Sequence, residues 1–491
     1  MDNTTGTRDR RWLGLFAILA AMIMNLLDST VVNVAAPSIR GDLGGSETSL
    51  QWIAASYTLA LAVGLLTGGR LGDMFGRRRV LLIGVAGFLI ASMLCAVAWS
   101  PGTLIGARVV QGLFGAVMIP QAFGLIRDLF PPHEIGKAFG ALGPVIGLST
   151  ILGPVVAGAL VDADVAGTGW RMVFLINLPI GAFSLLAGAR ALPVRNGDRA
   201  IRLDAGGALL ASLAIFLLIY PLVQGRELGW PAWLLAVAAG GVAALAVFVA
   251  QQLRRKRNGE TPLVEFSVLA RRSYTSGVGF VIVFFGSVVG FSLAIGLFLQ
   301  LGLGFSPVRA SLAMASWAVG AFLGSGFGAT MMGKLGRRIL HLGLGLMTVG
   351  LAAAHVVLGR AGAGVDGWDL ALPLVVYGFG MGMIFVPLFD IIMGEVTDHE
   401  VGSASGLLES FQQVGASLGV AVLGTVFFSG AGGRPTGADF VGAAQDVTLL
   451  ALGLTVTAFL LGFLLPRRAR ATGHGEPAPA AGEPERQPAL V

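Results

Sequence analysis

Charged residues are scarce in this chain of 491 residues. Only 12% are Asp, Glu, Lys or Arg, against roughly 25% in an average soluble domain. Hydrophobic residues make up 55% of the chain, and the mean hydropathy is +0.80. So few charges cannot cover the surface of a large soluble protein. The composition therefore excludes an ordinary soluble protein and predicts a membrane protein that crosses the bilayer many times.

Cysteine, histidine and nucleotide-binding motifs are equally sparse. The single cysteine, Cys95, lies within an apolar run, so neither an internal disulfide nor a cysteine metal site can form. The five histidines follow no metal-ligand spacing, and no Gly-x-x-x-x-Gly-Lys-Ser/Thr loop is present to bind ATP. We therefore expect no metal, no cofactor and no enzymatic activity.

Long apolar runs are abundant. A helix needs about 20 apolar residues to cross a hydrocarbon core of ~30 Å. Fourteen stretches meet this length, with approximate limits 12–35, 50–69, 80–100, 102–126, 136–161, 172–192, 204–224, 230–252, 274–301, 309–332, 339–358, 369–393, 403–428 and 445–465. The predicted fold class is an all-α polytopic membrane protein with fourteen transmembrane helices.

The basic residues test this count. Arg108 lies within a span, and 26 of the 33 Lys and Arg fall on the inner side. The outer loops hold only Arg40, Arg171, Arg226, Arg309, Arg360 and Arg434. Because positive residues are retained in the cytoplasm, we expect a multi-pass protein of the cell membrane with both termini cytoplasmic. The net charge of +6 sits in short clusters between spans, so we expect no nucleic acid partner.

Short patterns recur at offsets of 260 to 267 residues. Gly76-Arg-Arg78 returns as Gly336-Arg-Arg338, Gly115 to Pro120 as Gly382 to Pro387, and Gly140, Gly153 and Gly158 as Gly406, Gly419 and Gly424. This repetition predicts two six-helix repeats with two inserted helices between them, and a substrate site at the repeat interface. The predicted division is a disordered cytoplasmic N-terminus (1–10), an N-terminal bundle (11–195), the inserted helices (196–260), a C-terminal bundle (261–466) and a disordered cytoplasmic tail (467–491).

Two charges stand deep in the predicted spans. At 1.5 Å per residue, Asp28 lies roughly 20–24 Å above the inner surface and Arg108 about 10 Å below the outer one. A charge at that depth is costly unless it is paired or faces water, so both are candidates for function. Burial favours a protonated carboxyl group and an arginine favours an ionised one, so Asp28 can exchange a proton as its surroundings change. A static ion pair between two helices is the alternative.

Two further acids lie in the second half of the chain. Glu409 stands about 12 Å into its span and takes the repeat position of Gly143. An acid in place of a small packing residue favours the attraction of a cationic substrate or of a second proton. Asp390 stands about 28 Å along its span, close to the inner mouth, where an acid is readily solvated. Both are predicted to take part in proton coupling, Asp390 less strongly.

The ordered set of motifs resembles the major facilitator superfamily, and within it the fourteen-span drug:proton antiporters. The loop Gly69-x-Leu71-Gly72-Asp73-x-x-Gly76-Arg77-Arg78 matches the family's signature loop between spans two and three. The other matches are Leu27-Asp28 with Asn33 and Pro37, Gln51-Trp52 with Tyr57, Arg108-Val-Val-Gln111-Gly112, Gly143-Pro-x-x-Gly147, Gly153-Pro154-x-x-x-Gly158, Trp170-Arg171-x-x-Phe174-Leu-Ile-Asn177-x-Pro179 and Gly402-Ser-Ala-Ser-Gly406. The resemblance extends from about residue 12 to 465 and implies the major facilitator fold.

The resemblance also implies roles. Asp28 and Arg108 would take part in proton coupling. The gating loop would act as a latch between the two halves, with Arg77 bridging two acids until one is neutralised; its residues are Gly69, Asp73, Gly76, Arg77, Arg78 and Asp128. The alternative is that its arginines only fix topology, and the second copy at Gly336 has no acid where Asp73 would fall. The antiporter motif would give span five a small, bendable face through Gly143, Gly147, Gly153, Pro154 and Gly158.

Polar and aromatic residues inside the spans are candidates for the substrate cavity, although such residues also pair helices. They are Asn25, Asn33, Gln51, Trp52, Gln121, Gln300 and Phe385. We predict a monomer that exports drug-like, lipophilic or cationic small molecules in exchange for protons by alternating access in the lipid bilayer. The alternatives are an exporter of an endogenous metabolite or lipid, a nutrient symporter or uniporter, a non-transporting membrane scaffold or sensor, and a membrane-embedded transferase.

Overall fold

The structure is a computed structural model that describes residues 3–131, 134, 142–197, 204–260, 262–263, 269, 271–394, 401–431 and 437–466. Within these ranges the regular elements are helical, which confirms the all-α class. The main helices are α1 (Asn3–Leu43), α2 (Glu47–Phe75), α3 (Arg77–Ala96), α4 (Pro101–Leu129), α6 (Leu142–Ala163), α7 (Met172–Leu175), α8 (Asn177–Ala191), α9 (Ala205–Leu228), α10 (Ala232–Arg257), α12 (Arg272–Leu297), α13 (Pro307–Leu335), α14 (Arg338–Ala361), α15 (Ala371–Met393), α16 (Val401–Ala431) and α17 (Gly437–Gly462).

Thirteen helices of the described residues are long and apolar enough to cross a membrane. They correspond to every predicted span except the fifth, 136–161. There, residues 135–141 lie outside the described part, and Gly153–Ala163 counts as a shorter apolar helix. The membrane-spanning architecture is confirmed, and the count of fourteen stays a prediction.

Local sequence explains where several helices begin and end. Gly76 and Gly336 follow α2 and α13 with φ values of +90° and +51°, a region that glycine enters without the steric penalty of a Cβ atom. Ser100 starts α4 with a reciprocal capping pair: its side chain accepts from the Thr103 N–H, and the Thr103 side chain accepts from the Ser100 N–H. In both copies of the Gly-Arg-Arg pattern, the glycine thus ends a helix with a positive φ.

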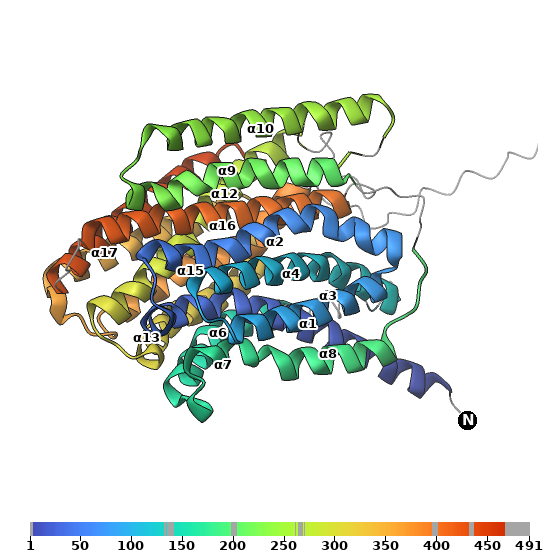
Figure 1. Ribbon diagram of the computed structural model, residues 1–491, viewed down its shortest axis with the longest axis horizontal. Coiled ribbons are helices and arrows are strands. Elements are labelled where there is room, and N and C mark those ends of the chain that lie inside the picture. The colour runs from blue at the N-terminus through green and yellow to red at the C-terminus, as the bar shows by residue number, and fades with distance from the viewer. Residues whose placement is uncertain are drawn as a thin grey trace, which may run out of the picture.

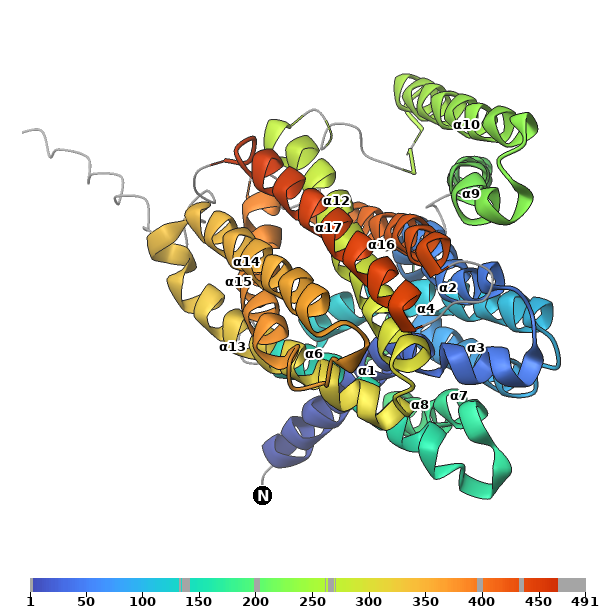
Figure 2. The same ribbon diagram turned by 90° about the vertical axis from the view of Figure 1, so that its left-hand side faces the viewer.

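The helices form two groups with the same pairing pattern (Figure 1). In the first group, α4 packs on α2 and α3, and α1 packs on α6 and α8. In the second group, α15 packs on α13 and α14, and α12 packs on α16 and α17. Figure 2 shows α9 and α10 at the edge of the molecule, where α9 packs on α2 and α16 and α10 packs on α9. These contacts agree with the predicted arrangement of two six-helix repeats and two inserted helices. The exact domain limits stay predictions.

The two most extensive contacts between the groups are those of α2 with α16 and of α6 with α13. Each pair combines the second helix of one group with the fifth of the other. A Cβ atom at Gly158 of α6 would lie 2.7 Å from the carbonyl oxygen of Pro307, and one at Gly424 of α16 would lie 2.5 Å from Nε2 of Gln51. Gly158 and Gly424 hold matching repeat positions, so each duplicated glycine stands at a close contact between the two groups.

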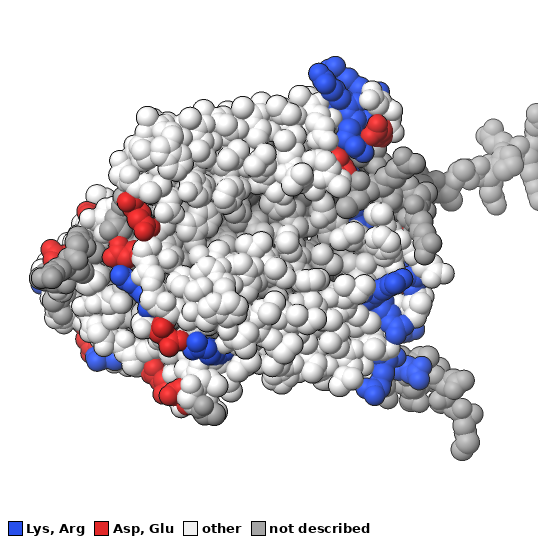
Figure 3. Space-filling model, viewed as in Figure 1, with Lys and Arg blue, Asp and Glu red and all other residues white. Residues whose placement is uncertain are grey.

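Charge distinguishes the two ends of the bundle. Figure 3 shows arginine and lysine gathered at one end, a broad belt without charge, and an opposite end where acids are frequent. The basic end carries Arg77 to Arg79 at the start of α3 and Arg254 to Arg257 at the end of α10. The acidic end carries Asp42 near the end of α1 and Glu227 near the end of α9. Such an uncharged belt fits a hydrocarbon core of ~30 Å.

Candidate functional site

Asp28 of α1 and Arg108 of α4 form an ion pair inside the first helical group. Their side chains are 0% and 1% exposed. The Arg108 Nε atom also donates to the backbone carbonyl of Ile53 over 3.4 Å, and its guanidinium carbon lies 4.0 Å from the centre of the Tyr57 ring. The structure thus brings together the two charges that the sequence places at similar depth. Their role in proton coupling stays a prediction.

Amide groups complete the surroundings of the Asp28 carboxylate. Gln111 Nε2 donates to Oδ1 over 2.8 Å, and Asn177 Nδ2 donates to the same oxygen over 2.9 Å. Gln111 also accepts from Arg108 Nη1 over 2.8 Å, so a single amide contacts both ions. Ser92 accepts from both amides, over 2.9 Å and 3.2 Å. These hydrogen bonds offset part of the free-energy cost of removing the two ions from water, which is on the order of several kcal/mol for each ion.

Sequence reasoning did not identify Gln111, Asn177 and Ser92 as partners of Asp28. Gln111 and Asn177 stood in the motifs, but a buried amide indicates helix packing as readily as a polar site. One usable signal was spacing, because Gln111 lies three residues after Arg108 and therefore on the same face of α4. Within the described part, Asn177 Oδ1 and the Tyr57 hydroxyl have no hydrogen-bond partner. These two polar atoms are therefore available for further hydrogen bonds within the cluster.

The gating loop forms a second cluster of charges, at the basic end. Arg77 Nη2 lies 3.2 Å from Asp73 Oδ1, and Arg77 Nη1 lies 3.6 Å from Asp128 Oδ2 at the end of α4. Arg195 pairs with the other oxygen of Asp128 at 2.7 Å. The bridge expected of Arg77 is therefore present. These four residues all belong to the first half, so the contacts hold α2, α3, α4 and the segment after α8 to one another.

One contact of this loop reaches beyond the first half. Arg70 Nη2 donates to the carbonyl oxygen of Pro262, which precedes α12. Gly69 lies within α2, where a Cβ atom would meet Pro120 of α4 at an ordinary 3.8 Å. A latch between the halves stays a prediction for this loop.

Arginines in both copies of the Gly-Arg-Arg pattern bind helix carbonyls. Arg78 Nη2 donates to the carbonyl oxygen of Ala189 near the end of α8. Arg337 Nη1 donates to the carbonyls of Phe463 and Leu465, just after α17, over 2.8 Å and 2.5 Å. A cation at a helix C-terminus stabilises that end by about 0.3–1 kcal/mol. Each copy thus fastens the sixth helix of its own group.

The antiporter motif lies along α6. Gly143, Gly147 and Pro154 fall within this helix. A Cβ atom at Gly153 would lie 2.7 Å from Thr30 Oγ1, so α6 approaches α1 closely at that point, whereas Gly158 faces α13. The motif therefore contacts both helical groups.

Glu409 is half-buried in the membrane-length part of α16. Its Oε1 accepts from Gln413 Nε2 over 3.3 Å and from Gln412 Nε2 over 3.4 Å. The backbone of Asp390 lies in α15, and its side chain lies outside the described residues, as does that of Asn33. The structure thus leaves the proposed second proton site of Glu409 and Asp390 as a prediction.

The predicted cavity residues lie in separate places. Asn25 is buried, and its Nδ2 has no hydrogen-bond partner among the described residues, whereas Gln51 lies against Gly424. Gln121 donates to the carbonyl of Gly68 over 2.7 Å, and Gln300 donates to that of Gly296 over 3.5 Å. The Phe385 ring lies 5.4 Å from that of Phe285, and Trp52 donates to Gln224 of α9 over 3.3 Å. Trp52 was predicted to line the substrate cavity, and its side chain faces the inserted helix α9. A central cavity lined by this set stays a prediction.

Two matched groups of membrane-length helices, with a buried ion pair inside the first of them, are the architecture of a polytopic membrane transporter. Residues 18–420 match the family model described as Major Facilitator Superfamily. The chain belongs to this family, and it is accordingly a transporter rather than an enzyme.

Relatives and solved structures agree with that assignment. The chain is 48% identical to a probable actinorhodin transporter of Streptomyces coelicolor, over 90% of this chain and 77% of the relative. It is 35% identical to a tetracenomycin C resistance and export protein of Streptomyces glaucescens, over 87% and 78%. Its fold is similar to the crystal structure of a bacterial homologue of the human lysosomal transporter Spinster, with a TM-score of 0.64, 16% identity and coverage of 92% and 95%.

Proposed function

We propose that this protein exports antibiotic-type small molecules from the cell in exchange for protons, by alternating access. Support for export comes from relatives that are named as a transporter of actinorhodin and as a resistance and export protein for tetracenomycin C. Support for proton exchange comes from the fully buried Asp28–Arg108 pair. In this proposal both termini and the basic end face the cytoplasm, and the protein acts as a monomer.

The ion pair gives the proton a means to change the conformation. Protonation of Asp28 removes the negative charge that Arg108, Gln111 and Asn177 now bind. Loss of one partner of a buried pair costs about 3–5 kcal/mol. Shifting a two-state equilibrium from 1:99 to 99:1 requires about 5.5 kcal/mol. A single protonation at Asp28 is therefore of the right size to bias α1 against α4 and to favour the opposite-facing state.

The buried pair is tested by transport into inside-out vesicles under an imposed pH gradient. Asp28→Asn keeps the shape of the side chain and removes the titratable group. We expect gradient-driven transport to fall by at least about tenfold, while exchange of labelled for unlabelled substrate without a gradient continues. Asp42→Asn, on the exposed end of the same helix, is the control and should transport normally. Unimpaired gradient-driven transport by Asp28→Asn would exclude this residue as the coupling site.

A further inference from the structure

The inserted helix α9 leaves a cavity between itself and the first helical group. The cavity has a volume of about 520 Å³ and lies between α2, α4 and α9. Its walls include Trp52 and Ser56 of α2, Val109 of α4, and Phe216 and Tyr220 of α9. We call it the α9 groove. Its volume is within the roughly 300–1,000 Å³ typical of sites for drug-sized ligands.

The α9 groove opens to the side of the bundle, toward the bilayer. Three of its wall residues, Val109, Leu113 and Phe216, are 38%, 43% and 43% exposed. Ser56 lies nine residues from the start of α2 and Tyr220 eight residues before the end of α9, both starting from the acidic end. At 1.5 Å per residue these positions are about 12–14 Å from that end, inside the hydrocarbon core. A ligand would therefore enter from the lipid.

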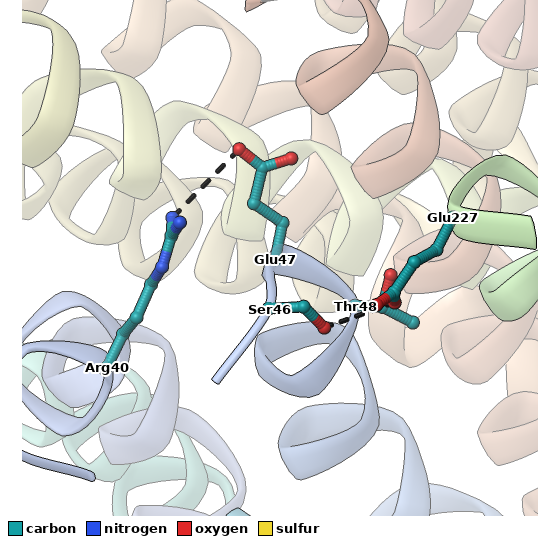
Figure 4. A pocket seen from close by; sticks show the side chains of 5 residues that line it. All are labelled: Arg40, Ser46, Glu47, Thr48 and Glu227. Carbon is teal, nitrogen blue, oxygen red and sulfur yellow. Dashed lines mark hydrogen bonds and ion pairs between the residues drawn. The ribbon is translucent and has the colours of Figure 1, made fainter. Parts of the chain in front are cut away.

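Hydrogen bonds fix the rim of the groove at the acidic end. Ser46 Oγ donates to Glu227 Oε2 over 3.1 Å, which ties the start of α2 to the end of α9 (Figure 4). One layer deeper, Trp52 Nε1 donates to Gln224 Oε1 over 3.3 Å. On the far side of α9, Thr425 Oγ1 of α16 donates to the carbonyl of Leu222 over 3.2 Å. The separation of α9 from α2 and α4 is thus held by specific contacts.

The walls have a definite chemistry. The rings of Trp52, Phe216 and Tyr220 form one cluster, with centroid distances of 6.1, 6.1 and 5.6 Å. Ser56 is 3% exposed, and its hydroxyl has no hydrogen-bond partner among the described residues. The residues that line the groove carry no charged side chain. Flat aromatic walls favour a planar ring system, the unused hydroxyl favours a hydrogen-bonding substituent, and the lack of charge disfavours an ion.

We propose that the α9 groove binds the exported substrate as it passes between the protein and the bilayer, and that this substrate is an uncharged, planar aromatic amphiphile. The proposal rests on the export function above. A lipid acyl chain has the right polarity, but it has no group that would satisfy the Ser56 hydroxyl. The inserted helix α9 then supplies one wall of a lateral site, separate from the interface between the two halves.

Binding is tested on the full chain in nanodiscs with N-phenyl-1-naphthylamine, an uncharged aromatic amine. The fluorescence energy transfer from Trp52 to the probe measures how much probe is bound in the groove. It is obtained as the difference in energy transfer between the parent protein and Trp52→Phe. In Val109→Phe the larger side chain fills part of the groove. We therefore expect the affinity of this variant for the probe to fall at least about tenfold. Val110→Phe is the matched control, because Val110 follows on the same helix, is also 38% exposed and does not line the groove. Equal losses in both variants would overturn the proposal.

A second pair of variants tests the hydrogen bond. Ser56→Ala should weaken probe binding by about three- to tenfold, the effect of one neutral hydrogen bond. Ser212→Ala should leave binding unchanged, because this lining hydroxyl already donates to the carbonyl of Ala208 over 2.7 Å. An unchanged affinity in Ser56→Ala contradicts the assignment of that hydroxyl to the ligand.

Lipid occupancy and failure of export give different results. If brominated phosphatidylcholine quenches Trp52 and the probe does not relieve the quenching, an acyl chain fills the groove and the proposal is overturned. If Val109→Phe loses probe binding but exports normally, the groove is not on the substrate's route, and the proposal is also overturned. If the parent protein binds the probe but transports nothing under a pH gradient, the export function fails and the binding site stands. Parallel loss of binding and of export in Val109→Phe alone supports both.

Discussion

Two acids of α1 differ because of what surrounds them. Asp28 is enclosed by Arg108 and two amides, whereas Asp42 lies half-exposed beyond the membrane-length part of the helix. Asp42 Oδ2 accepts from Trp170 Nε1 over 3.0 Å and from Arg171 Nη1 over 2.6 Å. These two hydrogen bonds, that of Trp170 foremost, lower the pKa of Asp42 below its ordinary 3.8. The first acid can couple to the interior of the bundle, and the second fastens an external turn.

The Asp42 contact has a defined pH dependence. A lowered pKa in the folded state means that the contact adds stability above the unfolded value and loses it as the pH falls through the folded value. We expect the indole 15N–1H signal of Trp170, assigned by Trp170→Phe, to titrate with a midpoint below 3.8. Arg171→Gln should move the midpoint upward. A midpoint at or above 3.8 in the parent protein would show that these hydrogen bonds do not favour the ionised acid.

The depth of a residue could be predicted from the sequence, and its direction could not. Each helical residue rises by 1.5 Å, so Asp28 and Arg108 could be placed at one level before any packing was known. The direction of Trp52 depends on how α2 is rotated against its neighbours, and α9 lies beside it. Gln111 and Asn177 were missed for a related reason, because only the assembled bundle shows that both amides reach the Asp28 carboxylate.

Among the helices, the two crossings between groups are related but unequal. At the α6–α13 crossing, a Cβ atom on Gly158 would meet the backbone carbonyl of Pro307. At the α2–α16 crossing, a Cβ atom on Gly424 would meet the end of the flexible Gln51 side chain. Backbone cannot move aside as a side chain can. The duplicated glycine is therefore required more strictly in α6 than in α16.

Alanine substitutions measure this difference. Gly158→Ala should destabilise the folded protein by about 1–3 kcal/mol, because the extra methyl group forces α6 from α13. Gly424→Ala should stay within about 1 kcal/mol of the parent, because Gln51 can turn away and alanine favours the helix. Gly279→Ala on α12, where a Cβ atom meets nothing within 4 Å, is the control. The measurement is the unfolding transition in mixed micelles. Equal losses at Gly158 and Gly424 would contradict the proposed difference.

Sequence repetition predicted two six-helix repeats, but the pairing of their helices across the interface became visible only in the structure. The offset of 266 residues that relates Gly158 to Gly424 places both at equivalent positions of duplicated bundles. The count of helices came from hydropathy and from the distribution of basic residues, and in the fifth span it depends on residues 135–141, which lie outside the described part. Repeated contacts therefore give a firmer account of the fold than the length of any single apolar run.

For the whole molecule, alternating access requires the two groups to move against each other. Gln51 and Gly424 lie four residues and seven residues from the acidic-end termini of α2 and α16. Their contact belongs to the seam that has to open when the acidic end opens. Ser287 Oγ of α12 and Thr455 Oγ1 of α17 lie 3.4 Å apart within the second group, so this contact does not cross the seam.

A disulfide across the seam should therefore stop transport. A Cβ atom at Gly424 would lie 3.3 Å from Cγ of Gln51. In Gln51→Cys/Gly424→Cys, the two Cβ atoms can therefore approach the separation of about 3.5–4.5 Å that a disulfide needs. We expect oxidation to abolish export from vesicles and reduction to restore it. Ser287→Cys/Thr455→Cys, cross-linked within one group, should export under both conditions. Continued export by the fully oxidised seam variant would show that the acidic end does not open at this contact.

The single thiol of the chain lies beside the ion pair. Cys95 is buried, and its Sγ donates to Oε1 of Gln111 over 3.5 Å, the same oxygen that accepts from Arg108. Water that reaches the Asp28 carboxylate has to enter the same cluster, where it also brings dissolved alkylating reagents to this sulfur. If Asp28 is the proton site, as proposed above, the rate at which a small maleimide reacts with Cys95 should follow the fraction of each transport cycle during which water reaches this cluster.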